Sequence, residues 1–224
     1  MPGPEGAGGG NCRVIKGAIF DVDGTLLDSM HIWDSIGEDY LRSLGYEPRE
    51  KLNEKFKTMS LSQAAAYYRS EYGVALSVER ICAEVNGRIE NFYRNEASLK
   101  PGAAEFLKRL VQKDIKLAIA TATDDYLVEA ALRRCGVLGL FSGLFTCAMT
   151  GRGKTEPDIY RAAAARLGTR PRETLVFEDA LYALKTARAD GFPTAAVYDP
   201  HEPGQKELRE LADYYIEDFS SFIL

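Results

Sequence analysis

The sequence predicts an α/β fold, a doubly wound parallel sheet with helices on both faces and an inserted α-helical cap domain. Two observations support this prediction. Short, nearly continuous apolar segments alternate with longer segments of helical periodicity, which is typical of a parallel sheet buried between two layers of helices. The alternation is interrupted once, by residues 29–98, which have helical periodicity instead. At 224 residues, the chain is long enough for one large domain with such an insertion.

The predicted strands are short runs of β-branched or aliphatic residues that end abruptly at polar ones. They are residues 15–20, 116–121, 144–148, 174–178, 194–198 and, more weakly, 214–216. The predicted helices between them have a proline near the start or a glycine near the end, which mark helix termini. They are residues 101–112, 124–135, 157–167 and 180–190.

Changes in composition suggest the domain boundaries. Residues 1–13 begin with a Gly- and Pro-rich stretch and are predicted to be a disordered leader. Residues 14–28 and 99–224 contain the predicted strands and are expected to form the core. Residues 29–98 are rich in Tyr, Leu, Ala, Arg and Glu at helical spacing, so they are expected to form the helical cap.

The composition excludes several classes of protein. Lys and Arg total 28 against 33 Asp and Glu, a formal charge of −5, and no dense basic stripe is available to neutralise a nucleic-acid backbone. No apolar run approaches the roughly 20 residues that span a bilayer. The 4 cysteines form no C-x-x-C pair, and the 2 histidines are too few for a multi-histidine metal site. We therefore expect a cytoplasmic protein that binds neither nucleic acid nor membrane.

Polar side chains capable of chemistry follow several of the predicted strands. They are Asp21 and Asp23 after the first strand, Thr121 at the end of the second, Glu178 and Asp179 at the end of the fourth, and Lys154 in a loop before the third helix. Because ligands of open parallel sheets collect beyond the carboxyl ends of the strands, these side chains are expected to meet at one edge.

The acidic residues in this set predict a Mg²⁺ site. Several carboxylates packed together would repel one another and an anionic substrate unless a hard divalent cation joined them. The expected ligands are Asp21, Asp23, Glu178 and Asp179. Asp21 could attack phosphorus as a nucleophile, giving an aspartyl phosphate, and Asp23 could act as the acid and base, with a pKa raised by its acidic neighbours.

Other residues near the strand ends are expected to contact the phosphoryl group. Gly24 permits a tight turn in which backbone N–H groups face the phosphate oxygens, with Thr25 beside it. Thr121 can donate a hydroxyl hydrogen bond, with Ala122 next to it, and Lys154 supplies a positive charge to the phosphoryl oxygens.

Residues of the predicted cap and residues next to predicted helix starts are also candidates for specific roles. The cap residues expected to face the substrate include Trp33, Met59 and Ser60. Ser29 follows Asp28 just before the first helical segment of the cap, where the simplest interpretation is a helix cap. Thr121 could instead cap the helix that follows it, but Thr123 or Asp124 competes for that role, and the place of Thr121 at the strand end favours phosphate binding.

The chain resembles members of the haloacid dehalogenase-like hydrolase superfamily, in the branch with a helical cap after the first strand. Four signatures of that superfamily occur in order: D-x-D-G-T at residues 21–25, a hydroxyl residue at Thr121, K-x-x-P-D-x-[YF] at residues 154–160, and an acidic pair at residues 178–179. Each motif alone is weak, but together at strand ends they are a strong signal. Within the branch, the chain is similar to the beta-phosphoglucomutase and phosphoglycolate phosphatase group.

The resemblance implies a Rossmann-like core and specific roles at the site. The first aspartate, Asp21, would be the nucleophile and Asp23 the acid/base. Mg²⁺ would be held by Asp21, the backbone carbonyl of Asp23 and the acidic pair Glu178 and Asp179.

The chain departs from the family pattern at several positions. Relatives often have proline where this chain has Thr155, and serine and glycine where it has Ala180 and Ala183. The mutases have a histidine and an arginine in the cap at positions that we align to Trp33 and Leu61. A mutase must hold a second phosphate in its cap, so the loss of both groups favours hydrolysis.

These observations predict a Mg²⁺-dependent phosphatase, a phosphoric monoester hydrolase, that acts on a small phosphorylated metabolite such as a sugar phosphate through an aspartyl-phosphate intermediate. One alternative is a phosphosugar mutase similar to beta-phosphoglucomutase. The other is a catalytically silent paralogue that binds a metabolite or a partner. We expect a monomer or a weak homodimer.

Overall fold

The computed structural model describes residues 14–56, 59 and 61–224 of the chain. The predicted leader, residues 1–13, and the predicted substrate contact Ser60 lie outside the described residues.

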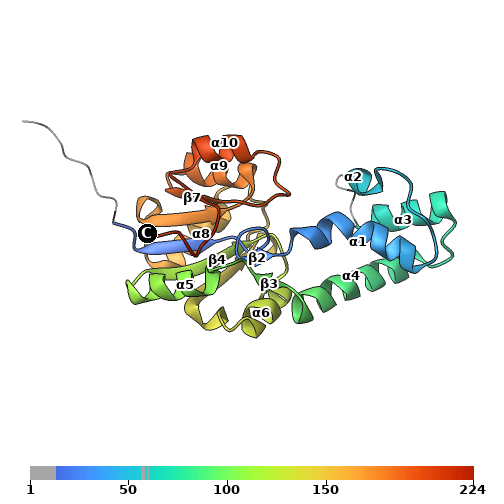
Figure 1. Cartoon of the computed structure of the whole chain (residues 1–224), viewed down its shortest axis with the longest axis horizontal. Helices are drawn as coiled ribbons and strands as arrows, with labels where there is room; N and C mark the ends of the chain where they lie inside the picture. The colour runs from blue at the N-terminus through green and yellow to red at the C-terminus, as the bar shows by residue number, and fades with distance from the viewer. Residues whose placement is uncertain (1–13, 57–58, 60) are drawn as a thin grey trace, which may run out of the picture.

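A six-stranded parallel sheet forms the centre of the fold (Figure 1). Its strand order is β5-β4-β1-β6-β7-β8. The strands are β5 (Phe141–Thr146), β4 (Lys116–Thr121), β1 (Gly17–Phe20), β6 (Thr174–Glu178), β7 (Thr194–Val197) and β8 (Tyr214–Ile216). The prediction of a parallel sheet is therefore confirmed.

The order of the strands reverses at β1, and this places the site. β1 pairs in parallel with both β4 and β6, so that Phe20 lies opposite Ile119 on one side and Phe177 on the other. In a doubly wound sheet, the crevice beyond such a reversal point is where ligands bind. The residues that follow β1 and β6 therefore lie at the expected binding position.

Helices cover both faces of this sheet, as predicted. They are α5 (Ala103–Gln112), α6 (Asp125–Arg134), α8 (Asp158–Leu167), α9 (Leu181–Ala189) and α10 (Gln205–Leu211). Alternate residues of each strand point to opposite faces. Phe20 thus packs with Phe106 of α5 on one face, whereas its neighbour Ile19 belongs to the cluster on the other face that contains Tyr160 of α8 and Ala187 of α9.

One predicted strand differs from the structure at both ends. The sequence pattern predicts a strand over residues 144–148, but β5 is Phe141–Thr146 and the short helix α7 (Cys147–Thr150) follows it directly. The helix begins there because the Thr146 hydroxyl accepts a hydrogen bond from the backbone N–H of Met149, at 3.2 Å. This N-cap ends the strand before the apolar run ends.

A separate group of helices, here called the helical lobe, extends away from the sheet (Figure 1). It comprises α1 (Met30–Ser43), α2 (Leu52–Phe56), α3 (Leu61–Tyr72) and α4 (Val78–Asn95). The interior of the lobe is apolar, with Tyr40 of α1, Tyr68 of α3 and Val85 of α4 buried in it, and it is continuous with the hydrophobic cluster on one face of the sheet.

The chain enters and leaves the helical lobe through a small antiparallel pair of strands. These are β2 (Leu27–Asp28) and β3 (Ser98–Leu99). Leu27 lies opposite Leu99 and Asp28 opposite Ser98. Both connections therefore pass beside the segment that follows β1.

Candidate active site

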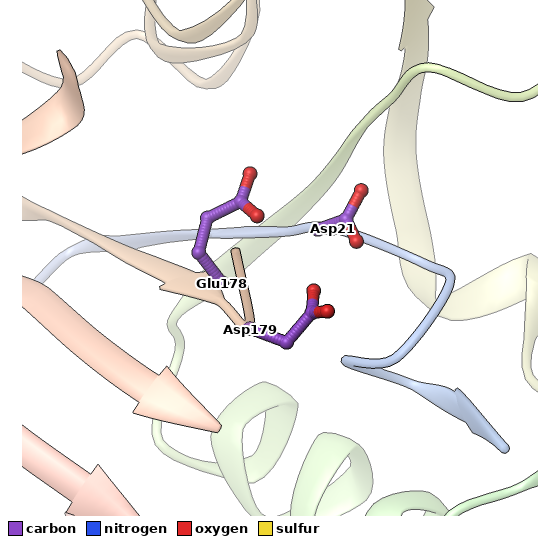
Figure 2. Close-up of side chains that lie close together, drawn as sticks. All are labelled: Asp21, Glu178 and Asp179. Carbon is purple, nitrogen blue, oxygen red and sulfur yellow. The ribbon is translucent and has the colours of Figure 1, made fainter. Parts of the chain in front are cut away.

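Three buried carboxylates meet at the carboxyl ends of the two central strands. Asp21 follows β1, Glu178 ends β6, and Asp179 follows Glu178. The backbone N–H of Asp21 donates to the carbonyl of Phe177 at 3.0 Å. The hydrogen-bonded pairing of β1 with β6 therefore extends to Asp21, the candidate nucleophile. One oxygen from each carboxylate lies within 4.8 Å of the others. Figure 2 shows Asp21 and Asp179 facing one another across a small gap, with Glu178 beside them.

The ammonium of Lys154 is buried against two of these acids. It donates to Oδ1 of Asp21 and, at 2.7 Å, to Oε1 of Glu178. Burial alone would lower the pKa of Lys154, but the charges of Asp21 and Glu178 raise this pKa well above its usual value. Lys154 therefore places a positive charge next to the Asp21 carboxylate, and its expected contact with the phosphoryl oxygens stays a prediction.

The three carboxylates carry more negative charge than one lysine can balance. Burial raises the pKa of Glu178 to about 7, and burial together with the charge of Asp21 raises that of Asp179 well above its usual range. Tyr160 donates to Oε1 of Glu178 at 2.7 Å, whereas Oε2 of Glu178 is buried with no hydrogen-bond partner among the described residues.

This arrangement fits a divalent cation. Mg²⁺ prefers hard oxygen ligands, and carboxylates supply both the oxygens and the compensating charge. A buried oxygen without a partner is costly unless an ion or water satisfies it. The donor set of Asp21, Glu178 and Asp179 thus matches the chemistry of Mg²⁺.

Asp23 lies apart from this acidic cluster and is held by three hydroxyl groups. Ser29 donates to Oδ1 at 2.6 Å, Tyr93 donates to the same oxygen, and Thr123 donates to Oδ2 at 2.7 Å. Burial and then the charge of Asp21 raise the pKa of Asp23, while the three hydrogen bonds act in the opposite direction. A raised pKa suits a carboxyl group that must give and take a proton.

The sequence analysis missed the three hydroxyl groups on Asp23, and two of its interpretations change. Ser29 occupies the N-cap position of α1, but its side chain makes no capping hydrogen bond and is bonded to Asp23 instead. Thr123 likewise bonds Asp23, and the N-cap position of α6 is occupied by Asp124, whose side chain makes no capping hydrogen bond. Tyr93 had no signal in the sequence, because it is one of several tyrosines at helical spacing.

The turn after β1, which contains Gly24 and Thr25, packs against Asp179. Gly24 has a φ of 77°, and a Cβ at this position would lie 2.3 Å from Oδ2 of Asp179. The hydroxyl of Thr25 is fully buried and donates to Oδ1 of Asp179 at 2.9 Å. Gly24 and Thr25 therefore orient Asp179, and neither lines the cavity described next.

A cavity of about 980 Å³ lies between the sheet edge and the helical lobe. The expected site residues that line it from the core are Asp21, Asp23, Thr121, Ala122, Lys154, Glu178 and Asp179. From the helical lobe, the expected residues Trp33 and Met59 line it, together with Leu61. The structure thus brings together residues from distant parts of the chain around one space.

Thr121 occupies the end of β4 within this cavity. It is almost completely buried, and its Oγ1 accepts a hydrogen bond from the backbone N–H of Thr123 at 3.1 Å. Because that bond uses the oxygen as an acceptor, the hydroxyl hydrogen remains available for an anion.

A buried acidic cluster and a lysine at the reversal point of a doubly wound sheet are characteristic of enzymes that transfer groups at the strand ends. Consistent with this class, the family model of haloacid dehalogenase-like hydrolases matches residues 15–191. The chain therefore belongs to the haloacid dehalogenase-like hydrolase family, which confirms the resemblance noted in the sequence.

Named relatives and solved structures are similar over nearly the whole chain. The chain is 29% identical over 222 residues to a Drosophila melanogaster protein named "Probable pseudouridine-5'-phosphatase", covering 92% of this chain and 94% of the relative. It is 31% identical over 208 residues to hexitol phosphatase A of Escherichia coli, covering 92% and 93%. A CbbY variant from Rhodobacter sphaeroides, crystallised with xylulose-1,5-bisphosphate, aligns with a TM-score of 0.72 and 25% identity, over 93% of this chain and 96% of that one.

In the part of the chain that the structure describes, no helix is both long enough and apolar enough to cross a bilayer.

Proposed function

We propose that this chain is a Mg²⁺-dependent phosphatase that hydrolyses a small phosphorylated metabolite, such as a sugar phosphate, through an aspartyl phosphate on Asp21. The observation that carries the proposal is the position of Asp21. Its carboxylate lines the cavity, contacts Lys154, and belongs to the acidic cluster with Glu178 and Asp179. The relatives named as phosphatases of pseudouridine 5'-phosphate and of hexitol phosphates support the same reaction class.

In the first step, an oxygen of the Asp21 carboxylate forms a bond to phosphorus while the bond from phosphorus to the ester oxygen breaks. The proton of the Asp23 carboxyl group passes to that departing oxygen, so the leaving group departs as an alcohol. The raised pKa of Asp23 favours the protonated form that this step needs.

In the second step, the aspartyl phosphate on Asp21 is hydrolysed. Asp23, now a carboxylate, takes a proton from a water molecule as the water oxygen bonds to phosphorus. The bond from phosphorus to the Asp21 oxygen breaks, which releases inorganic phosphate and restores both carboxyl groups to their starting states.

The surrounding residues lower the barrier by charge and position. Lys154 places its ammonium beside the attacking carboxylate and the phosphoryl oxygens. Thr121 offers its hydroxyl hydrogen to the same group, and Ala122 follows Thr121 along the cavity wall. Mg²⁺ held by Asp21, Glu178 and Asp179, with the backbone carbonyl of Asp23, would neutralise the repulsion between carboxylate and phosphate.

The lobe side of the cavity favours hydrolysis over the mutase alternative. Trp33 and Leu61 line the cavity at the positions where the sequence comparison expected a histidine and an arginine in mutases. Neither side chain carries a positive charge with which to hold a second phosphate. We therefore propose that the helical lobe acts as the cap, with Trp33 and Met59 on the substrate side, and that water completes the reaction.

The catalytically silent alternative has little support. It rested on Thr155, Ala180 and Ala183, and the acids and the lysine are assembled in spite of these changes. Ala183 packs in the core as a buried residue of α9, so it has a structural use. We retain the expectations of a cytoplasmic location and of a monomer or weak homodimer as part of this proposal.

The variant Asp21→Asn tests the proposal. We expect no phosphate release from a panel of phosphorylated metabolites, and an unchanged circular dichroism spectrum, because asparagine has the same shape but is a poor nucleophile. Asp39→Asn is the matched control, because Asp39 is exposed on α1 and pairs with Arg42. Near-normal turnover of p-nitrophenyl phosphate by Asp21→Asn would contradict the proposal.

A further inference from the structure

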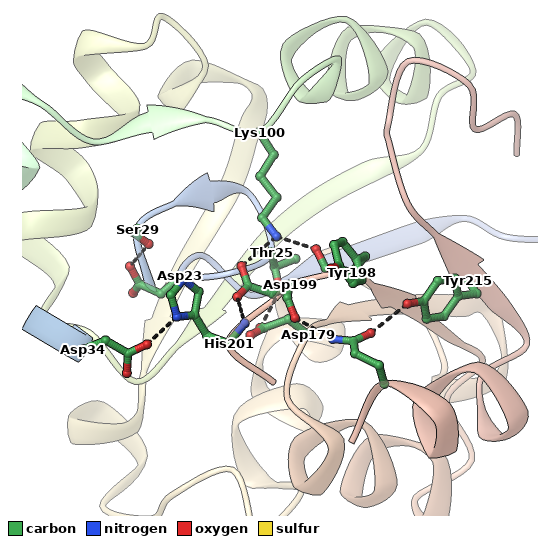
Figure 3. Close-up of polar contacts among 11 residues, drawn as sticks. Asp23, Thr25, Ser29, Asp34, Lys100, Asp179, Tyr198, Asp199, His201 and Tyr215 are labelled. Atoms are coloured by element: carbon green, nitrogen blue, oxygen red, sulfur yellow. Dashed lines mark hydrogen bonds and ion pairs between the residues drawn. The ribbon is translucent and has the colours of Figure 1, made fainter. Parts of the chain in front are cut away.

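A polar contact joins the helical lobe to the core at a place that the proposed mechanism does not use. Nδ1 of His201 contacts Oδ2 of Asp34 (Figure 3). Asp34 is in the first turns of α1, and His201 is in the loop between β7 and α10. Both residues line the cavity. The contact therefore joins the lobe side of the cavity to its core side.

The backbone of His201 is held by the ion pair of Asp199 with Lys100. Its backbone N–H donates to Oδ1 of Asp199 at 2.9 Å. Asp199 is 1% exposed, and its other oxygen accepts from Nζ of Lys100 at 2.9 Å. Nζ of Lys100 also donates to the carbonyl of Tyr198 at 2.6 Å (Figure 3). The loop that carries His201 is thereby held in one arrangement.

The same ion pair is anchored where the chain returns from the helical lobe. Lys100 directly follows β3, and its backbone N–H donates to the carbonyl of Leu26 at 2.8 Å. Leu26 precedes β2, through which the chain enters the lobe. Asp34 and His201 are thus connected to the base of the lobe through Asp199 and Lys100.

The contact lies at the rim of the cavity. The Asp34 and His201 side chains are 37% and 27% exposed, so they are accessible from solvent as well as lining the cavity. Two aromatic cavity residues are also half exposed, Trp33 at 41% beside Asp34 and Tyr182 at 52% on the core side. The catalytic candidates Asp21 and Lys154 are buried beneath this rim.

We propose that the Asp34–His201 contact is a specificity-determining latch, which fixes the distance between α1 and the loop after β7 and so limits the size of the leaving group. This inference rests on the proposed phosphatase function. With the latch intact, a compact ester is enclosed and water is excluded from it, which favours reaction. Without the latch, α1 can move outward, compact esters are held less well, and bulky esters gain access.

The test is a double-mutant cycle on substrate selectivity. Wild type, Asp34→Ala, His201→Ala and the double variant are assayed with esters graded in size, with glycerol 3-phosphate as the compact probe and uridine 5'-monophosphate as the bulky one. The readout is the ratio of kcat/KM for the two probes. We expect each single variant to lower this ratio about tenfold, a size typical of altered substrate positioning. The double variant should lower it no further, because the pair acts as one unit.

A matched control and the outcomes that would overturn the proposal complete the test. Asp39→Ala removes an acid of the same helix that does not line the cavity, and it should leave the ratio unchanged. An unchanged ratio in both single variants overturns the latch, and so do additive effects in the double variant. If wild type releases phosphate from neither probe nor from any ester of the wider metabolite panel, the proposed function itself fails and the latch fails with it. A ratio that stays constant while hydrolysis depends on Asp21 contradicts only the latch.

Discussion

Tyr93 donates a hydrogen bond to Asp23, although the two residues are 70 positions apart in the chain. Tyr93 is in the last turns of α4, where the chain is about to leave the helical lobe, and Asp23 follows β1. Ser29, where the chain enters the lobe, donates to the same oxygen of Asp23. Both connections of the lobe therefore contact the proposed acid/base directly.

Replacing Tyr93 by phenylalanine should shift the pH dependence of turnover. Asp23 must be protonated to act on the leaving group, so turnover falls as pH rises through its pKa. The hydrogen bond from Tyr93 lowers this pKa, because it favours the charged carboxylate. Its loss should raise the pKa, so the alkaline limb of the kcat profile should move to higher pH.

Tyr40→Phe is the matched control for this prediction. Tyr40 is also a buried tyrosine of the helical lobe, but its hydroxyl donates to Glu84, at 2.9 Å. We expect its pH profile to match wild type. A shift of the alkaline limb to lower pH in Tyr93→Phe would contradict this prediction.

Magnesium should stabilise the folded protein. Asp21, Glu178 and Asp179 are buried together, so a cation that binds them only in the folded state raises the free energy of unfolding by about 2.7 kcal/mol at a hundred times its Kd. For a chain of this size, that corresponds to a rise in Tm of roughly 5–10 °C. Differential scanning calorimetry with Mg²⁺ and with a chelator measures the difference.

The variant Asp179→Asn should show a much smaller rise, because one charged ligand is lost. Asp39→Asn should keep the full rise. Chelation should also stop phosphate release by wild type. Equal Tm values with and without Mg²⁺ in wild type would argue against a metal at the acidic cluster.

Alanine at Gly24 should disturb both folding and catalysis. Alanine is strained at a φ of 77°, which costs about 1–3 kcal/mol, and its Cβ would meet Oδ2 of Asp179 at 2.3 Å. A displaced Asp179 should lower kcat/KM about a hundredfold, the size expected for a misplacement of about 1 Å. Urea unfolding and steady-state kinetics measure the two effects.

The variant Gly45→Ala separates the steric clash with Asp179 from the backbone strain of a positive φ. Gly45 also has a positive φ, 85°, but no atom lies within 4 Å of the position of its Cβ. We expect a comparable loss of stability and no loss of kcat/KM. If Gly24→Ala retains wild-type kinetics, the turn does not orient Asp179 in the way that the structure indicates.

Methionine at Lys154 should reduce kcat by about a hundredfold to a thousandfold, because a positioned charge at the phosphoryl group is lost. It also leaves Asp21 and Glu178 without their shared cation. Removing one partner of a buried pair costs about 3–5 kcal/mol, and added Mg²⁺ should recover part of this loss. Thermal unfolding with and without Mg²⁺ measures the recovery.

The control for Lys154 is Lys185→Met, since Lys185 is half exposed and pairs with Glu207 at 2.5 Å. Neither kcat nor Tm should change noticeably in that variant. A Lys154→Met enzyme with kcat within a few-fold of wild type would remove Lys154 from the proposed mechanism.

The sheet could be predicted from sequence because its strands are buried on both faces. The predicted strands at residues 116–121, 174–178 and 214–216 match β4, β6 and β8. Continuous apolar runs followed by polar residues indicate both the strand and its carboxyl end. The resemblance in four motifs located Asp21 and Lys154, whose contact the structure then contains.

Contacts between the helical lobe and the core could not be predicted in the same way. Tyr93 and His201 have no local pattern that distinguishes them, since each depends on a partner far away in the chain, Asp23 and Asp34. Ser29 was misinterpreted because the same hydroxyl that can cap a helix can also serve a neighbouring carboxylate. The partners of these side chains can be identified only when the orientation of the lobe relative to the core is known.

The central position of β1 predicts the order in which parts of the molecule unfold locally. Amide hydrogens of a strand paired on both sides, as β1 is with β4 and β6, exchange with solvent only in rare, extensive openings. Backbone pairing at the base of the helical lobe is limited to two residue pairs, Leu27 with Leu99 and Asp28 with Ser98, and side-chain contacts such as Tyr93 with Asp23 and Asp34 with His201 add to it. Deuterium uptake should therefore begin in the lobe, and the backbone that carries Asp21 should be among the last to exchange.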